Sequence, residues 1–256
     1  MTNGLKVTIA GLDFYGQGYH DFVISPDGFD GWDDGVDMRL ENTARPYAHG
    51  SFNLPTFQDS RTVSISGNVF ADSPQRLARL RSRLTGLLAD GGIGRVQVER
   101  FGDVQWADGR LAAKTMFTER GGQGSASFQI QVWCPDPRKF GNARDFVRTN
   151  GTVSVFHRGN FNALPTVTVR GSAANGYRLN GPGGLQYKVS RALVSGIPHR
   201  IEFTDGRLRV NGTVVATGAD SADVWPVPPG QSVDFDINVL SGGTAEATIT
   251  ITDTYI

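Results

Sequence analysis

Cysteine is almost absent from this chain: Cys134 is the single one among 256 residues. A lone cysteine excludes an intrachain disulfide and leaves no cysteine cluster that would bind zinc. Cys134 stands on the inward phase of an alternating segment, with no histidine near it in the sequence. We therefore interpret it as a small buried apolar residue and not as a nucleophile. The composition predicts folding in a reducing cytoplasm.

An excess of charge of either sign is also missing. The basic and acidic side chains number 16 and 17 up to residue 145, and 9 and 8 beyond it. Nucleic-acid-binding domains usually carry a basic excess, so we expect no tight binding to nucleic acid. No hydrophobic run approaches the roughly 18 apolar residues of a membrane helix, so we expect no membrane insertion.

Motifs of catalytic chemistry are missing as well. The sequence has no H-E-x-x-H, no Cys-x-x-Cys and no G-x-S-x-G. Its histidines are scattered and unpaired: His20, His49, His157 and His199. We therefore predict that the chain is not an enzyme, and that it has no cofactor and no catalytic residue.

One stretch is acidic and rich in glycine, from Asp27 to Asp37. Clustered aspartates are candidate calcium ligands, but the spacing does not match the EF-hand loop. A solvated acidic loop is the favoured interpretation, and a metal site is the alternative.

The first half of the chain is rich in strand patterns and carries one helix pattern. Residues Arg61 to Phe70 and Ser125 to Cys134 alternate apolar and polar side chains, as half-buried strands do, and Gly94 to Arg100 is a shorter strand of the same kind. Ser73 and Pro74 are typical of a helix start, and we predict a helix over about 74–89. Its leucines share one stripe: Leu77, Leu80, Leu84, Leu87 and Leu88. An Asp108-Gly109 pair predicts a tight turn.

The arginines of this helix have two interpretations. They occupy much of its remaining surface: Arg76, Arg79, Arg81 and Arg83. An arginine-rich helix can contact a phosphate backbone. Because the chain is neutral overall, a solvated face on a helix that packs against a sheet is favoured.

A rigid joint, Trp133 to Gly141, separates this part from a second one that has no helix pattern. The pairs Asp205-Gly206 and Asn211-Gly212 stand between short alternating segments and predict three consecutive antiparallel strands. Alternation continues over 233–239 and 247–252. We predict a mainly β protein: a β-rich module with one helix over 1–145 and an antiparallel β-sandwich over 146–256.

Three aromatic residues of the second module are candidates for stacking on a sugar: Tyr177, Tyr187 and Trp225. Aromatic side chains also fill the cores of β-sandwiches, and that interpretation is favoured.

Several motifs, taken in order, resemble the distal tail protein family of long-tailed siphophages. They are Arg45-Pro46-Tyr47-Ala48-His49-Gly50, the strand Arg61 to Gly67 with the helix after Ser73, Asp136-Pro137-Arg138-Lys139-Phe140-Gly141, Gly159 to Val169, the two hairpin pairs, and Trp225-Pro226-Val227-Pro228-Pro229-Gly230. The acidic stretch Asp27 to Asp37 departs from the family pattern. The resemblance covers nearly the whole chain.

The resemblance implies a structural virion protein. Family members form a hexameric ring through their first modules, and the second, galectin-like sandwich projects outward. The ring joins the tail tube protein to the hub and receptor-binding proteins of the tail tip, and DNA passes through it. The implied location is the virion tail tip, after assembly in the host cytoplasm. Exposed strand edges of the first module are a hypothetical source of the ring contact.

Two other functions compete with this one. The sandwich is alternatively a carbohydrate-binding module for host cell-wall glycan, which is compatible with the ring. The chain is also conceivable as a cell-wall hydrolase, but the absence of a zinc or nucleophile motif counts against it.

Overall fold

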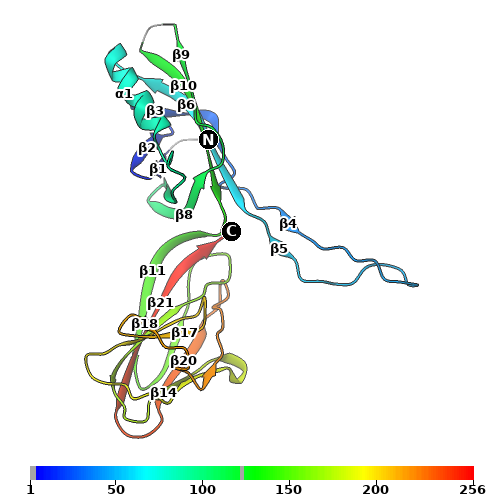
Figure 1. Cartoon of the computed structure of the whole chain (residues 1–256), viewed down its shortest axis with the longest axis vertical. Coiled ribbons are helices and arrows are strands. Elements are labelled where there is room, and N and C mark those ends of the chain that lie inside the picture. Colours follow the sequence, from blue (N-terminus) through cyan, green and yellow to red (C-terminus); the bar gives the residue numbers. More distant parts are fainter. Residues whose placement is uncertain (1–3, 122–123) are drawn as a thin grey trace. The chain divides into compact units, whose positions relative to one another are not determined.

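The chain divides between Lys139 and Phe140, close to the end of the predicted joint. Figure 1 shows a computed structural model, which describes residues 4–121 and 124–256. Unit 1 ends at Lys139 and includes Ile256, and unit 2 comprises Phe140–Tyr255. The sequence placed the module boundary a few residues later, at 145. Each unit has its own hydrophobic core and is described by itself.

The main sheet of unit 1 closes on itself. Its strands are β1 (Leu5–Ile9), β2 (Leu12–Tyr15), β3 (Phe22–Asp30), β6 (Arg61–Phe70), β7 (Gly94–Arg100), β8 (Asp103–Leu111), β9 (Met116–Arg120) and β10 (Ser125–Cys134). The spatial order is β8-β7-β1-β2-β3-β6-β10-β9. The sheet closes because β10 also pairs with β8, through Val132 opposite Leu111 and Trp133 opposite Arg110.

The core of unit 1 lies inside this closed sheet. The alternating strands β6 and β10 have the bounds and the inward face predicted from the sequence, and Phe128, Ile130, Val132 and Cys134 are all buried. Phe14, Phe22 and Phe128 form an aromatic cluster with ring centroids 5.4–5.7 Å apart. Period-two alternation therefore identified the strands that line the core.

The helix α1 (Pro74–Thr85) begins as predicted and ends four residues early. The Ser73 hydroxyl accepts a hydrogen bond from the Arg76 amide at 3.3 Å, and Leu77, Leu80 and Leu84 are buried. The helix stops at Gly86, so Leu87 and Leu88 pack against the core from the turn that follows. Three of the four arginines are exposed: Arg79, Arg81 and Arg83.

The turn predicted at Asp108-Gly109 is wrong. Both residues lie inside β8, and the hairpin turn falls at Phe101-Gly102, whose φ angles are 50° and 86°. A Cβ on Gly109 would lie 2.6 Å from Val132 Cγ1 and 2.8 Å from the Trp133 carbonyl oxygen. Glycine is therefore needed here for the close approach of β10 where the sheet closes, and not for a turn.

Two sheets make up unit 2. The first has the order β18-β17-β16-β13-β21-β11 and the second β12-β20-β14-β15-β19. The strands of the first are β11 (Lys139–Thr149), β13 (Thr166–Ser172), β16 (His199–Glu202), β17 (Arg207–Val210), β18 (Thr213–Val214) and β21 (Thr244–Tyr255). Those of the second are β12 (Gly151–Val155), β14 (Tyr177–Asn180), β15 (Gln186–Val189), β19 (Ser221–Ala222) and β20 (Val233–Val239), and a 3-10 turn, η1 (Pro182–Gly184), joins β14 to β15.

The inward faces of both sheets form one core, as in a β-sandwich. Val167, Val169 and Ile249 of the first sheet are fully buried in one cluster with Phe235 and Ile237 of the second. The predicted meander is confirmed: β16, β17 and β18 pair antiparallel in succession. Its second turn has left-handed φ angles at both residues of the asparagine-glycine pair, 48° and 80°.

Candidate interaction surfaces

The three aromatic residues that are candidates for stacking on a sugar lie in the core of unit 2, as the favoured interpretation predicts. Tyr177 and Tyr187 have no exposed surface, and Trp225 is 1% exposed. Trp225 packs against Phe203 and Phe235 with ring centroids 4.9 and 5.2 Å away. A ring that offers no face to solvent cannot stack on a sugar, so the core interpretation holds for all three.

The acidic stretch Asp27 to Asp37 is not one loop. Asp27 and Asp30 belong to β3, and only the segment after Gly31 is irregular. Asp33 pairs with Arg100, with 2.6 Å between carboxylate and guanidinium. Within residues 4–121 and 124–256, no three side chains of histidine, cysteine, aspartate or glutamate come together as metal ligands. The same residues contain no helix that is long and apolar enough to span a membrane.

Backbone carbonyls of this segment surround a buried arginine. Arg61 is 1% exposed, and its Nη1 donates to the carbonyl oxygens of Gly31, Trp32 and Asp34 at 2.7–3.0 Å. Its Nε donates to the Pro137 carbonyl oxygen at 3.0 Å. The guanidinium therefore ties the acidic segment to the joint.

Lys139 extends the same cluster. Its ammonium donates to the Trp32 carbonyl oxygen at 2.8 Å, and its side chain is 5% exposed. Burial, with the nearby charge of Arg61, lowers the pKa of Lys139 to about 8. We call Arg61, Lys139 and the carbonyls of Gly31, Trp32, Asp34 and Pro137 the anchor. Sequence reasoning missed it, because no pattern of residue types predicts which backbone carbonyls a buried cation will meet.

Between residue 34 and Arg61 of the anchor, residues 37–59 leave the sheet as a long hairpin, which we call the arm (Figure 1). Two short strands, β4 (Met38–Arg39) and β5 (Phe57–Gln58), pair at its base. Hydrogen bonds continue toward the tip: the Phe52 amide donates to the Thr43 carbonyl at 2.9 Å, and the Arg45 amide to the Gly50 carbonyl at 3.1 Å. The arm is thus an ordered ribbon with a reversal at 46–49.

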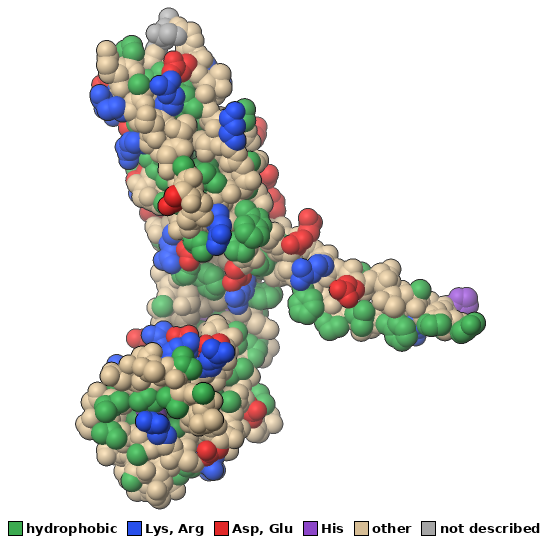
Figure 2. All heavy atoms as spheres, in the orientation of Figure 1, with side chains coloured by type: hydrophobic (Ala, Val, Ile, Leu, Met, Phe, Trp, Pro, Cys, Tyr) green, Lys and Arg blue, Asp and Glu red, His purple; other side chains and the backbone are tan. Residues whose placement is uncertain are grey.

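The arm exposes large apolar side chains. Met38, Leu40, Tyr47, Phe52 and Phe57 are 50–109% exposed. Figure 2 shows hydrophobic side chains gathered along one edge of the arm. A two-stranded ribbon has no second layer against which to bury them, and it is marginally stable alone. Contiguous exposed apolar surface of this kind marks an interaction site.

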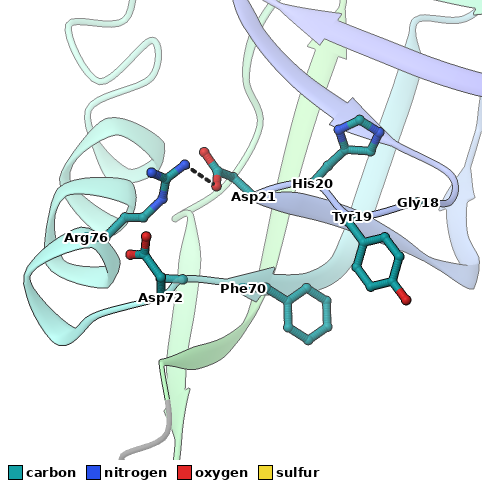
Figure 3. Close-up of a pocket in the computed structure, with 8 residues that line it drawn as sticks. Gly18, Tyr19, His20, Asp21, Phe70, Asp72 and Arg76 are labelled. Carbon is teal, nitrogen blue, oxygen red and sulfur yellow. Dashed lines mark hydrogen bonds and ion pairs between the residues drawn. The ribbon is translucent and has the colours of Figure 1, made fainter.

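A groove lies on unit 1 at the far end of β6 from the arm. Its volume is about 680 Å³, and it is lined by the β2–β3 turn, the end of β6 and the start of α1: Gly18, Tyr19, His20, Asp21, Phe70, Ala71, Asp72 and Arg76. Figure 3 shows the Tyr19 and Phe70 rings on one side and the charged side chains on the other. Tyr19 and Phe70 are 108% and 51% exposed.

The charges of the groove do not balance. Arg76 Nη2 lies 2.8 Å from Asp21 Oδ1 (Figure 3), and Asp72 adds a second carboxylate beside the same guanidinium. Two carboxylates and one guanidinium give the groove a net negative charge. It therefore combines exposed aromatic rings with an acidic wall.

Cys134 is fully buried beside Gly109 and Arg61. Burial raises the pKa of its thiol to about 11. A thiol that is protonated at neutral pH and shielded from solvent is a structural side chain, as the sequence indicated.

Comparisons by sequence find nothing: no protein-family model and no curated protein matches the chain. Solved structures do match. The crystal structure of the Dit protein (gp 19.1) of phage SPP1 aligns with a TM-score of 0.74 at 16% identity, over 98% of this chain and 99% of that one. The chain has the fold of the SPP1 Dit protein. The resemblance predicted from the motifs is confirmed at the level of fold.

The SPP1 protein is a paradigm of the hub adsorption apparatus of phages that infect Gram-positive bacteria. A chain of the phage P2 baseplate in its activated conformation with calcium aligns more weakly, with a TM-score of 0.45 at 11% identity over 96% of this chain and 97% of that one.

Proposed function

We propose that this chain is a structural protein of a phage tail tip. Six copies form a ring through unit 1, and the ring joins the tail tube protein to the hub and receptor-binding proteins. The observation that carries the proposal is the arm, because its apolar side chains have no partner layer within their own hairpin. The fold shared with the SPP1 Dit protein supports it.

The arm provides a contact of the kind that a ring needs. A ring requires two different patches on each copy, so that one patch of a subunit meets the other patch of the next. The arm is one such patch, and it extends from the start of β6. The second patch can then lie elsewhere on the surface of unit 1. Free edges of the arm strands and of β9 offer additional backbone pairing.

Neutral charge suits a ring through which DNA passes. Each phosphate that a protein neutralises strengthens binding by release of counterions, so a basic lining would retain the DNA. The balance of 25 basic and 25 acidic side chains avoids such an excess. The proposed location is the virion tail tip, with assembly in the host cytoplasm.

Light scattering on the purified full chain tests the ring. The chain should elute at the mass of six copies of 27.6 kDa, about 166 kDa. A variant with a polar arm (Met38→Ser, Leu40→Ser, Phe52→Ser and Phe57→Ser) should be monomeric with an unchanged circular dichroism spectrum. The matched control is Ile93→Ser with Phe101→Ser, which removes exposed apolar side chains elsewhere in unit 1 and should leave the hexamer intact. A monomeric wild-type chain at all concentrations would contradict the proposal.

Glycan binding by unit 2 is a second candidate, on a surface other than the one first predicted. The outer face of the sheet with β12, β14 and β20 carries linked carboxylates and amides. Asp236 accepts hydrogen bonds from Thr152, Asn180 and Asn238 at 2.6–3.3 Å. Such groups suit sugar hydroxyls, although this set contains no exposed ring. A glycan array probed with the full chain tests this binding. If the chain binds no glycan on the array, only the structural role remains.

A further inference from the structure

We propose that the groove at the end of β6 receives the arm tip of a second copy of this chain. The tip is the segment Arg45 to Phe52, and the acceptor is the surface formed by Tyr19, Phe70, Asp72 and the Asp21–Arg76 pair. This inference rests on the proposed ring and names the two surfaces that meet in it.

Charge is the first observation that favours this occupant. The arm has no acidic side chain between Glu41 and Asp59, and its tip carries Arg45. The groove has two carboxylates for one guanidinium. A basic tip and an acidic groove attract one another, whereas two tips or two grooves repel, so the contact is directional.

The groove and the arm tip also match in shape and chemistry. The groove exposes the rings of Tyr19 and Phe70, and the tip exposes Tyr47 and Phe52. The volume of about 680 Å³ suits a few side chains and not a whole domain. The Arg45 guanidinium already lies 5.9 Å from the Phe52 ring centroid, so the tip presents cation and ring together.

The positions of the arm and the groove favour the arm tip of a second copy, and not the chain's own tip, as the occupant of the groove. The arm leaves unit 1 at the start of β6, whereas Phe70, Ala71 and Asp72 lie at the other end of this strand. Ten residues of strand span about 30 Å. Figure 1 shows the arm extended away from the closed sheet, so its tip does not reach its own groove. Each subunit therefore presents tip and groove at separate places, as a head-to-tail ring requires.

Cross-linking tests the pairing directly. In the double variant Tyr47→Cys with Phe70→Cys, a bifunctional maleimide should produce a ladder up to the hexamer on a denaturing gel. The native Cys134 is buried and should not react. The matched control is Tyr47→Cys with Phe101→Cys, whose second site is 85% exposed but lies on the β7–β8 turn, and it should give no ladder.

Charge reversal supplies an independent readout. Arg45→Glu and Asp72→Arg should each raise the concentration at which half the chains assemble by about tenfold, and the double variant should restore assembly. Arg79→Glu, on the exposed face of α1, is the control for a general charge effect and should change little.

The outcomes separate the pairing from the ring. A ladder with Phe70→Cys and rescue by the double charge variant support the pairing. If the chain forms a hexamer but gives neither the cross-linked ladder nor the rescue, the pairing of tip and groove is wrong and the ring still holds. A chain that stays monomeric overturns the ring, and the pairing with it.

Discussion

Aromatic side chains have opposite environments in the sandwich and in the arm. Phe203, Trp225 and Phe235 pack between two sheets and are about 1% exposed, whereas Tyr47, Phe52 and Phe57 are at least half exposed. Residue type does not explain the difference. A strand buries its apolar face only where a second layer covers it, and the arm is a ribbon with no such layer. The core aromatics therefore stabilise the chain, and those of the arm are available to another molecule.

The largest expected difference comes from the same substitution, phenylalanine to alanine, in the sandwich core and in the arm. Phe203→Ala should lower the free energy of unfolding by about 4 kcal/mol, because it leaves a cavity in the sandwich core. Phe57→Ala should change it by less than about 0.5 kcal/mol, because its ring is 58% exposed. Urea unfolding followed by tryptophan fluorescence, at concentrations where the chain is unassembled, measures both. Equal losses would show that the Phe57 ring contributes as much to stability as the buried Phe203 ring.

The anchor gives the next largest effect. Arg61→Met should cost about 3 kcal/mol, because it leaves the carbonyls of Gly31, Asp34 and Pro137 without their donor, and the Trp32 carbonyl keeps only Lys139. Arg81→Met is the matched control: its ion pair with Glu119 is half exposed on both sides, and its loss should cost about 0.5 kcal/mol or less. If the two variants unfold at the same urea concentration, the anchor is not a stabilising feature.

Alkaline pH tests the anchor in a different way. Burial holds the Lys139 pKa at about 8 in the folded chain, below the usual lysine value of 10.5. Between these values the unfolded chain binds the extra proton, so raising the pH favours the folded state. Lys139 should therefore contribute a rise in stability of up to about 1.4 kcal/mol per pH unit from pH 8 to 10.5.

Other groups titrate in this range, so the measured quantity is the difference in unfolding free energy between the wild type and Lys139→Met. The free energy of unfolding of the wild type should increase relative to that of Lys139→Met as the pH rises from 8 to 10.5. A difference that stays constant across the range would show that Lys139 is not shifted.

The smallest expected effect is on Cys134. Because burial raises its thiol pKa to about 11, iodoacetamide at pH 8 should leave the folded chain unmodified and should modify it fully in urea. Tyr47→Cys on the arm should react in the folded chain, with one added label by mass spectrometry. Rapid labelling of native Cys134 would show that the closed sheet opens.

Much of the fold follows from the sequence, where local pattern and packing agree. The strands at 61–70, 94–100 and 125–134 and the meander after His199 alternate because one face is buried and the other is not. The helix start follows from Ser73 and Pro74, but its end does not, because Gly86 stops it before the leucine stripe runs out. The segment after β1 is rich in turn residues, yet it forms β2, which pairs with β1 in a hairpin, and β3, which pairs with the distant β6.

The interaction surfaces were less predictable. The motif Arg45 to Gly50 was visible as a family resemblance, but nothing in it shows that it stands at the tip of an exposed ribbon. The Asp108-Gly109 pair resembles a turn, but the role of Gly109 depends on the end of β10, which is more than twenty residues away in the sequence. Long-range contacts of this kind, like the carbonyls around Arg61, follow from the closed topology and not from any local pattern.

Negative-stain electron microscopy of the full chain beside its polar-arm variant is the most direct test that the arm assembles the molecule. We expect six-fold annuli for the wild type and single particles for the variant. Wild-type fields that contain only single particles, or annuli that survive in the variant, would contradict it.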